Sequence, residues 1–384
     1  MKNTERISGT GVMIWLVFMA LVSCHPGTQA YENVSSGTGM RYSRYMRIIP
    51  GEGYHRLDLV NPWDEARLYA SYFLDEGGLP DSLKTAGIPV IPVPVSRVAV
   101  TASPHVGMFS LLGKGNLIVG VDDKRNVYDS LLRHRIDEGK VRQVGTAGRL
   151  SVEEILALHP DVLLVSGFER NPTELLTIAE AGIPVVYTLG WMEQNPLGRA
   201  EWLKIAGYLT GKADEAKRIF DRVAERYTAL CGMRDSLAPK PPQVLAGQMW
   251  KGTWYAPGGQ SYFARLLGDA GIDYRWKDRK QTGSLMLDIE EVLARERGAE
   301  IWLYQGAAGS INEITEEDPR LQGIKAVRLG QVYGFYGKCN EAGVNAYWEE
   351  GYLNPDRILS DMLHVFYPQN FPGGEMHYIK PLTR

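Results

Sequence analysis

Residues 150–165 read LSVEEILALHPDVLLV, and most of the chain can be placed around this stretch. A related stretch, LDIEEVLARERGAEIWLY, occupies residues 287–304. The first copy shares five residues with the second: Leu150, Glu153, Glu154, Leu156 and Ala157. Each copy combines a helical pattern with a short apolar run typical of a strand buried in a parallel sheet. The repeat therefore predicts two related α/β lobes.

Both copies begin with a helix start signal. Ser151 and Asp288 are suitable N-cap residues, and Glu154 and Glu291 stand three positions later, where they would complete a capping box. The glutamate before each of them is then free to point outward from the first helical turn.

Composition limits the classes of function. The chain has 384 residues, 44% of them hydrophobic and 23% charged, and this length favours two domains. A formal net charge of −3 and the lack of basic clusters argue against nucleic acid as a partner.

The N-terminus resembles a bacterial lipoprotein signal. Lys2 and Arg6 precede the apolar run 12–22, and a cysteine follows at the cleavage point in Leu21-Val22-Ser23-Cys24. The alternative is a membrane-spanning anchor, but the run is much shorter than the roughly 20 residues that a bilayer requires. We expect a signal peptide over 1–23, a lipid on Cys24 that anchors an extracytoplasmic protein to the membrane, on the periplasmic side or in the cell envelope, and a flexible tether over 24–40.

The spacing of turn signals and apolar runs predicts the order of the domains. We expect a small β element and connector over 41–95, with a hairpin turn at 50–53, and an N-terminal α/β lobe over 96–196. A long helix over 197–230, with Gly211 as its candidate break, leads to a C-terminal α/β lobe over 243–384. Cys231 and Cys339 either pair or remain thiols, since their spacing decides neither.

This arrangement resembles the helical-backbone substrate-binding proteins of ABC importers, in particular those that deliver cobalamin, haem or ferric siderophores. The resemblance covers residues 96–366 and rests on the two repeat copies and the long helix. It implies two Rossmann-like α/β lobes joined by one backbone helix, a ligand cleft between them, and a monomer that is not an enzyme. It further implies a metal chelate of iron or cobalt as ligand, and an ABC permease with its ATPase as partner. Glu153 and Glu290 match the positions that dock to the permease.

Ligand-facing residues are expected in loops at the carboxyl ends of the strands. The richest loop is 249–259, MWKGTWYAPGG, whose Trp250, Trp254 and Tyr255 offer rigid surfaces for a planar or macrocyclic ligand. The other aromatic candidates are Phe168 and Trp191, followed by Tyr347 and Trp348. For an anionic group on the ligand, the candidates are Arg149, Arg170 and Lys251.

Other ligands and classes stay open at this point. His105 follows the first strand of the N-terminal lobe, as in a bare-metal site of related proteins, or it could ligate haem. Ala147 stands where the cobalamin-binding pattern has a tryptophan. The chain lacks GxSxG, HExxH and GxxxxGK[ST] motifs, which favours binding over an extracytoplasmic enzyme such as a chelatase or hydrolase. A scaffold lipoprotein would need neither an aromatic cleft nor matched glutamates.

Overall fold

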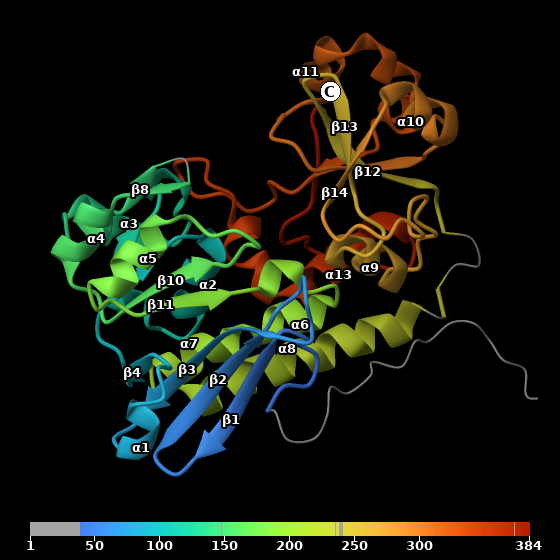
Figure 1. Cartoon of the computed structure of the whole chain (residues 1–384). Coiled ribbons are helices and arrows are strands. Elements are labelled where there is room, and N and C mark those ends of the chain that lie inside the picture. Colours follow the sequence, from blue (N-terminus) through green and yellow to red (C-terminus); the bar gives the residue numbers. More distant parts are fainter. Residues whose placement is uncertain (1–38, 147, 235, 238–240, 372) are drawn as a thin grey trace, which may run out of the picture. The chain divides into compact units, whose positions relative to one another are not determined.

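The structure is a computed structural model that describes residues 39–146, 148–234, 236–237, 241–371 and 373–384 (Figure 1). The predicted signal peptide, Cys24, most of the tether and Ala147 lie outside these residues. The described residues all belong to one compact unit, Asn33–Arg384. Among them, no helix combines the length and the apolar composition needed to cross a bilayer.

The chain first forms a four-stranded sheet in the order β1-β2-β3-β4. The predicted hairpin is present as β1 (Met46–Gly51) and β2 (Tyr54–Val60), which pair antiparallel. The element is larger than predicted, because β3 (Leu68–Asp75) adds to β2 and β4 (Val90–Pro92) adds in parallel to β3. The short helix α1 (Asp81–Lys84) connects the last two strands. One face of this sheet is buried in the core of the N-terminal lobe.

The N-terminal lobe contains the predicted parallel sheet, in the order β11-β10-β5-β6-β7. Its strands are β5 (Val98–Val100), β6 (Ile118–Val121), β7 (Arg142–Gln143), β10 (Val162–Ser166) and β11 (Val185–Thr188). Val98 and Val100 point into one core and Ala99 into another, so the sheet is covered on both faces. Helices α4 (Val152–Leu158) and α5 (Glu174–Glu180) pack on the Ala99 side, and α2 (Ser103–Leu111) and α3 (Ser130–Asp137) on the other. Two short strands, β8 (Gly145–Thr146) and β9 (Arg149–Leu150), pair antiparallel before α4.

The helical region between the lobes is divided into three helices. They are α6 (Pro196–Glu201), α7 (Leu203–Leu209) and the 22-residue α8 (Ala213–Arg234), which is the long helix in Figure 1. The break at Gly211 was predicted, and this glycine has a φ of 66°, which favours glycine. The break at Trp202 was not predicted; this side chain is fully buried.

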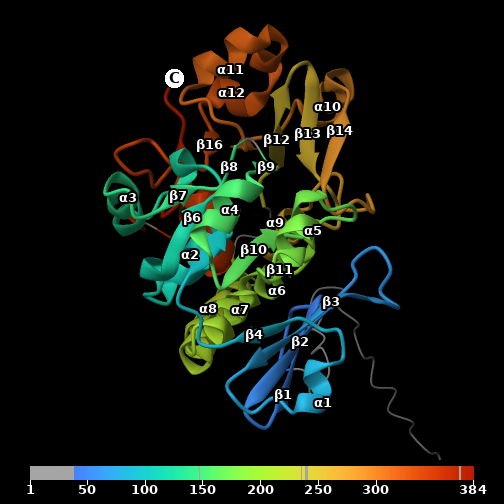
Figure 2. The same ribbon diagram turned by 60° about the vertical axis from the view of Figure 1, so that its left-hand side comes forward.

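The C-terminal lobe has a mixed six-stranded sheet in the order β14-β13-β12-β15-β16-β17 (Figure 2). The strands are β12 (Val244–Trp250), β13 (Thr253–Pro257), β14 (Ser284–Leu287), β15 (Ile301–Tyr304), β16 (Val332–Gly334) and β17 (Lys380–Pro381). The helices are α9 (Tyr262–Asp269), α10 (Ile289–Glu296), α11 (Ile311–Glu317), α12 (Lys325–Leu329) and α13 (Pro355–Phe366). In this sheet β15 pairs in parallel with β12 and with β16, and the pairs β12-β13, β13-β14 and β16-β17 are antiparallel.

The aromatic stretch 249–259 is a β-hairpin and not the predicted loop. Strands β12 and β13 pair antiparallel, with Trp250 opposite Thr253. The turn consists of Lys251 and Gly252, whose φ values of 50° and 80° are those of a tight hairpin turn. The alternation of a strand therefore decides which aromatic side chains face the core.

The two repeat copies form the predicted αβ units, α4-β10 and α10-β15. A short strand that was not predicted, β9 or β14, precedes each helix. Both N-caps are confirmed: the Ser151 hydroxyl accepts from the Glu154 amide at 3.3 Å, and the Asp288 carboxylate accepts from the Glu290 amide at 2.7 Å. The position of the helix start in each copy was thus readable from the sequence.

The second half of the predicted capping boxes is wrong. The Glu154 carboxylate accepts from Arg142 at 3.3 Å, while the Ser151 amide donates to the Val144 carbonyl. In the second copy, Glu291 forms an ion pair with Arg295 at 3.2 Å. Nearby arginines thus draw both carboxylates away from the cap.

Candidate functional site

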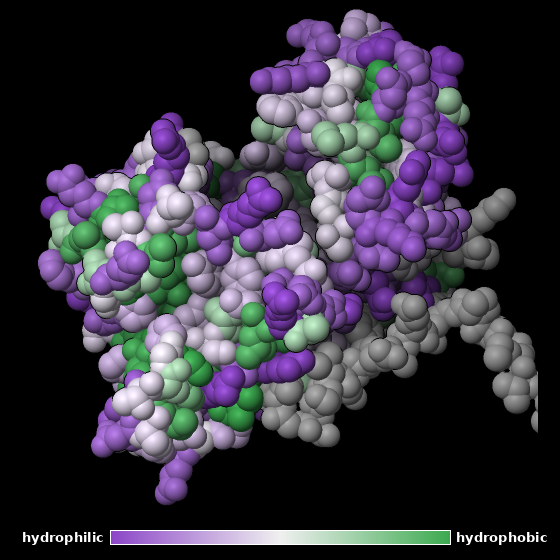
Figure 3. All heavy atoms as spheres, viewed as in Figure 1, coloured by the Kyte–Doolittle hydropathy of each residue, from purple (hydrophilic) through white to green (hydrophobic). Residues whose placement is uncertain are grey.

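A cavity of about 610 Å³ lies between the two lobes. The space-filling view shows the surface hollowed between them (Figure 3). The N-terminal lobe contributes Ser103 and Pro104 from α2, α6 contributes Pro196 and Arg199, and α9 contributes Tyr262 and Leu266. The N-terminal lobe also contributes Arg125 and Asn126. The rest of the wall comes from the segment before and at the start of α13: Tyr336, Ala342, Gly343, Val344, Asn345, Tyr347, Trp348, Gly351, Tyr352, Pro355 and Ile358.

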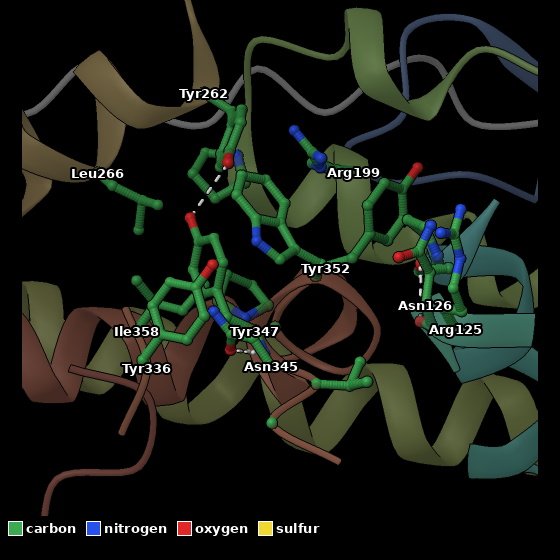
Figure 4. Close-up of a pocket in the computed structure, with 18 of the residues that line it drawn as sticks. Arg125, Asn126, Arg199, Tyr262, Leu266, Tyr336, Asn345, Tyr347, Tyr352 and Ile358 are labelled. Atoms are coloured by element: carbon green, nitrogen blue, oxygen red, sulfur yellow. Dashed lines mark hydrogen bonds between the residues drawn. The ribbon is translucent and has the colours of Figure 1, made fainter. Parts of the chain in front are cut away.

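Arg199 is held between two tyrosine rings in this pocket (Figure 4). Its guanidinium carbon lies 3.9 Å from the centre of the Tyr262 ring and 4.5 Å from that of the Tyr352 ring. The ring faces stabilise the cation but neutralise no charge. The Arg199 Nε is buried without a hydrogen-bond partner, and within the described ranges no carboxylate pairs with this side chain. The pocket thus presents a positioned cation whose hydrogen-bonding capacity is not used.

The other cation at the pocket differs in this respect. Arg125 is bonded to Asp123 at 2.7 Å, and its side chain is 81% exposed. Burial raises the pKa of Tyr347 and of Tyr352, so both phenols remain protonated at neutral pH. The Tyr262 and Tyr347 hydroxyls lie 3.2 Å apart. The lining therefore offers a cation, neutral hydroxyls and aromatic rings, and it includes no carboxylate.

Part of the pocket wall is a segment that fastens one lobe to the other, residues 336–353, here called the strap. The Asn340 amide donates to the Val127 and Tyr128 carbonyls at 3.2 and 3.1 Å. The Glu349 carboxylate accepts from the backbone amides of Tyr128 and Asp129 at 2.8 and 3.0 Å. Burial, with a further contribution from Asp129, raises the pKa of Glu349 to about 8. The strap thus connects the C-terminal lobe to the start of α3.

Of the residues predicted to face the ligand, Tyr347 and Trp348 line this pocket. The others do not: His105, Arg149, Phe168, Trp191, Trp250, Trp254 and Tyr255. His105 is 2% exposed, and its Nε2 lies 2.8 Å from the Thr188 hydroxyl. Burial lowers the pKa of His105 to about 3, so it is a neutral core histidine. The prediction that His105 contacts a ligand or a metal is corrected accordingly. Within the described ranges no group of three or more His, Cys, Asp or Glu side chains could hold a metal ion.

The hairpin explains which of the predicted aromatic residues in the C-terminal lobe are buried and which are exposed. Trp254 is fully buried and packs against Trp302 with ring centres 5.3 Å apart, so it is a core residue and not a ligand residue. Trp250, 54% exposed, and the half-buried Tyr255 lie on the opposite face, with ring centres 6.0 Å apart. Arg149 is exposed on β9.

Phe168 and Trp191 come together at the surface of the N-terminal lobe. Their ring centres are 5.5 Å apart, and they are 49% and 38% exposed. Each follows the carboxyl end of a parallel strand, as predicted.

The sequence reasoning missed the residues at the centre of the pocket. Arg199, Tyr262 and Tyr352 stand far apart in the sequence, and Arg199 looked like one more polar residue of a long helix. The sequence feature that pointed to the pocket was the group of aromatic residues in 347–352. Tyr347 and Trp348 of this group were predicted candidates, and both line the pocket.

The two predicted docking glutamates are exposed but differ in their partners. Among the described residues Glu153 forms no ion pair, whereas Glu290, 69% exposed, is paired with Arg320 at 2.7 Å. Cys231 and Cys339 form no disulfide with each other.

Two parallel-sheet lobes, a long connecting helix and a pocket between the lobes define a two-lobed binding protein. The family described as periplasmic binding protein matches residues 98–336, more than half of the chain, and the chain belongs to this family. The fold class and the family resemblance predicted from the sequence are both confirmed. Proteins of this family bind solutes and are not enzymes, which excludes the enzyme alternative. They deliver their ligands to ABC permeases.

Relatives and solved structures agree with this assignment. An uncharacterized lipoprotein of Methanocaldococcus jannaschii is 24% identical, over 88% of this chain and 84% of its own. A haem-binding protein of Pseudomonas aeruginosa has a TM-score of 0.57 at 16% identity, covering 76% of this chain and 99% of that one. A vitamin B12-binding protein of Vibrio cholerae has a TM-score of 0.51 at 15% identity, covering 71% and 98%. Lipoprotein relatives and a periplasmic family imply an extracytoplasmic location.

Proposed function

We propose that this chain is the substrate-binding component of an ABC importer and that its interlobe pocket captures an anionic metal chelate. The candidate chelates are ferric siderophores, haem and cobalamin, with iron or cobalt as the metal, and the requirement for an anionic group favours the first two over cobalamin. The observation that carries the proposal is Arg199, a positioned guanidinium with a buried Nε that has no partner. A carboxylate or catecholate of the ligand would supply the missing acceptor.

The chemistry of the lining supports this ligand class. Charge-assisted hydrogen bonds are about twice as strong as neutral ones, and an arginine fork matches a carboxylate. The rings of Tyr336, Tyr347 and Trp348 offer apolar faces to the remainder of the ligand. A site with aromatic walls, an unpaired arginine and no carboxylate in its lining selects an organic chelate rather than a bare metal ion, which would require anionic ligands.

Delivery is proposed to use Glu153 and Glu290 as contacts with the permease. Exposed carboxylates of this kind steer encounter and fix orientation more than they add affinity. Arg320 already neutralises part of the Glu290 charge, so the two lobes would contribute unequally. A lipid on Cys24 would keep the protein at the membrane where the permease stands.

Calorimetric titration of the mature chain with haemin, ferric siderophores and cyanocobalamin tests the proposed ligand class. We expect one anionic chelate to bind, and the substitution Arg199→Gln to weaken it about 10- to 100-fold, because a charge-assisted bond is lost. Arg125→Gln is the matched control, since this arginine is exposed and already paired, and it should change the affinity little. Binding of cyanocobalamin alone, or binding that ignores Arg199, contradicts the anionic assignment.

The docking proposal is tested by uptake of the identified chelate into cells. Charge reversal at both positions, Glu153→Lys with Glu290→Lys, should abolish uptake and leave the ligand affinity unchanged. Reversal of Glu180, an exposed glutamate at the C-terminal end of α5, serves as a control for the change of charge alone. Loss of ligand affinity in the double variant would refute the docking roles.

A further inference from the structure

Three aromatic side chains gather outside the pocket, on the surface of the N-terminal lobe. They are Trp63, Phe168 and Trp191, here called the shelf. The Trp191 ring centre lies 5.5 Å from that of Phe168 and 6.3 Å from that of Trp63. The rings are tilted by 39° and 52° to Trp191, so together they form a curved rather than a flat surface. Phe168 and Trp191 both belong to the exposed large hydrophobic residues of the described chain.

Hydrogen bonds hold the Trp191 indole and the backbone of Phe168 in place. The Trp191 indole donates to the Gly167 carbonyl at 2.9 Å. Below it, the Tyr69 hydroxyl donates to the Phe168 carbonyl at 2.7 Å and accepts from Asn171 at 2.6 Å. These polar groups are thus satisfied by the protein, and Phe168 and Trp191 remain 49% and 38% exposed, while Trp63 is partly buried against the core. Rigid aromatic faces of this kind bind another ring at little cost in conformational entropy.

Trp63 reaches the shelf from a different part of the chain. It lies in the turn between β2 and β3, in the N-terminal sheet that precedes the residues matched by the family. The Asn61 side chain accepts from the amides of Trp63 and Asp64, and the Asn61 amide donates to the Arg67 carbonyl. The turn is therefore ordered, and it completes the shelf with a residue that the two α/β lobes do not supply.

The shelf begins where the pocket wall ends. Tyr352 lines the pocket, and a Cβ on Gly190 would lie 1.5 Å from its hydroxyl oxygen, so the two residues are in direct contact. Trp191 is the next residue along the chain. On the same side, Gly167 lies against Tyr69 and Leu189, where a Cβ would meet atoms at 2.9 and 3.0 Å. Glycine at both positions thus permits the close approach of the pocket wall to the shelf.

We infer that the shelf is a second part of the ligand site, which stacks on a planar aromatic or macrocyclic ring of the chelate whose anionic group reaches Arg199. This inference rests on the proposed function. The residues beside the shelf carry charges of both signs, and Arg67 is already paired with Asp64 at 3.2 Å. The shelf therefore recognises the ring of the ligand, while Arg199 recognises its anionic group.

Two iron-containing probes separate the shelf from the pocket: haemin, which has a macrocycle and carboxylates, and ferric citrate, which has carboxylates and no ring. Removal of the shelf rings one at a time, Trp63→Ala, Phe168→Leu and Trp191→Ala, should weaken haemin about three- to tenfold each. The affinity for ferric citrate should stay within twofold of the wild-type value. Trp250→Ala is the matched control, because this indole is also at the surface, 54% exposed, but lies on the C-terminal hairpin.

Each outcome decides between the two proposals. If Arg199→Gln weakens haemin and all three shelf variants bind it as the wild type does, the shelf inference fails and the proposed function stands. If the wild type binds neither haemin nor ferric citrate, nor any other chelate, both fail. Sedimentation of the wild type and the Phe168→Leu variant provides a further check: a dimer that the substitution dissociates would assign the shelf to a second copy and overturn the inference. Phe168→Leu keeps an apolar side chain at an exposed site, so loss of folding does not account for its result.

Discussion

Arg199 owes its position to contacts that no local sequence pattern reports. The Asn195 side chain accepts from the Leu197 amide and Pro196 occupies the first helical turn, so α6 starts one residue earlier than predicted. That start signal was readable from the sequence. The two rings that sandwich the guanidinium come from α9 and from the strap, and their meeting depends on tertiary packing alone.

Gly190 provides a first prediction at this scale. Gly190→Ala would place a methyl group 1.5 Å from the Tyr352 hydroxyl oxygen, so Tyr352 must move away from Arg199. We expect the free energy of unfolding to fall by about 1–3 kcal/mol, as for other overpacked cores, measured by urea denaturation. Adding Tyr352→Phe removes the clashing oxygen and should restore part of the loss. Gly232→Ala, in α8 with open space around it, should instead be neutral or slightly stabilising. Equal losses at both glycines would contradict the packing explanation.

Glu349 provides a prediction about pH. Burial raises its pKa from 4.5 to about 8 in the folded chain, so between these values the folded state holds a proton that the unfolded state has released. Its contribution to stability is therefore complete below pH 4.5 and is lost as the pH rises through 8, with a slope of at most about 1.4 kcal/mol per pH unit.

Thermal unfolding of the Glu349→Gln variant measures this contribution as a difference from the wild type. The difference between the two free energies of unfolding should change across pH 4.5–8, because the amide cannot titrate. Other buried carboxyls, such as those of Glu193 and Asp361, are present in both proteins and cancel. Glu350→Gln is the matched control, because it alters the neighbouring carboxylate, which is 30% exposed and paired with Lys338. A pH-independent difference for Glu349→Gln would contradict the assignment of a raised pKa to Glu349.

At the scale of elements, hydrophobic periodicity was sufficient to predict a helix or strand where burial and local conformational preference favour the same element. Strands β6, β10 and β11 of the N-terminal parallel sheet are largely continuous apolar runs, the pattern of strands buried on both faces. Residues 249–259 were predicted to be a loop at the end of a strand. Gly252 instead forms the turn, and the resulting alternation buries Trp254 and exposes Trp250. The size of the N-terminal sheet was missed because pairing of β3 and β4 is a long-range contact.

The two repeat helices provide a prediction at the element scale. Ser151→Ala and Asp288→Ala each remove a side-chain acceptor from the first helical turn, at α4 and α10. Each should lower the free energy of unfolding by about 1 kcal/mol, measured by chemical denaturation. Thr173→Ala is the control, since the N-cap of α5 makes no side-chain hydrogen bond. A comparable loss at Thr173 would show that the cap bonds are not the cause.

The whole molecule joins two lobes by α8 and by the strap. The repeat predicted the lobes and the long stretch of helical composition predicted their connection. The pocket could not be predicted from the sequence, because its wall combines residues near positions 103, 199, 262 and 352, which no spacing rule relates. The strap was likewise unpredictable, because its polar side chains find their partners on the other lobe.

Asn340 allows the coupling of the lobes by the strap to be measured. Its side-chain oxygen accepts from the Ala342 and Val344 amides within the strap, while its NH₂ group donates to the Val127 and Tyr128 carbonyls of the N-terminal lobe. Asn340→Asp keeps the acceptor inside the strap but places an oxygen against the two carbonyls. We expect the lobes to separate more often, since each lost hydrogen bond contributes about 1 kcal/mol.

Hydrogen exchange at the Tyr128 and Asp129 amides reports this separation, because both donate to Glu349 of the strap. A loss of about 1 kcal/mol corresponds to roughly fivefold faster exchange at these amides. Amides of β10, in the core of the N-terminal lobe, should exchange as in the wild type. Glu341→Gln changes the charge of the next residue, which is exposed, and should leave all of these rates unchanged. Faster exchange throughout the N-terminal lobe would mean that the substitution destabilises the lobe itself, and unchanged exchange at Tyr128 and Asp129 would mean that the strap does not hold the lobes together.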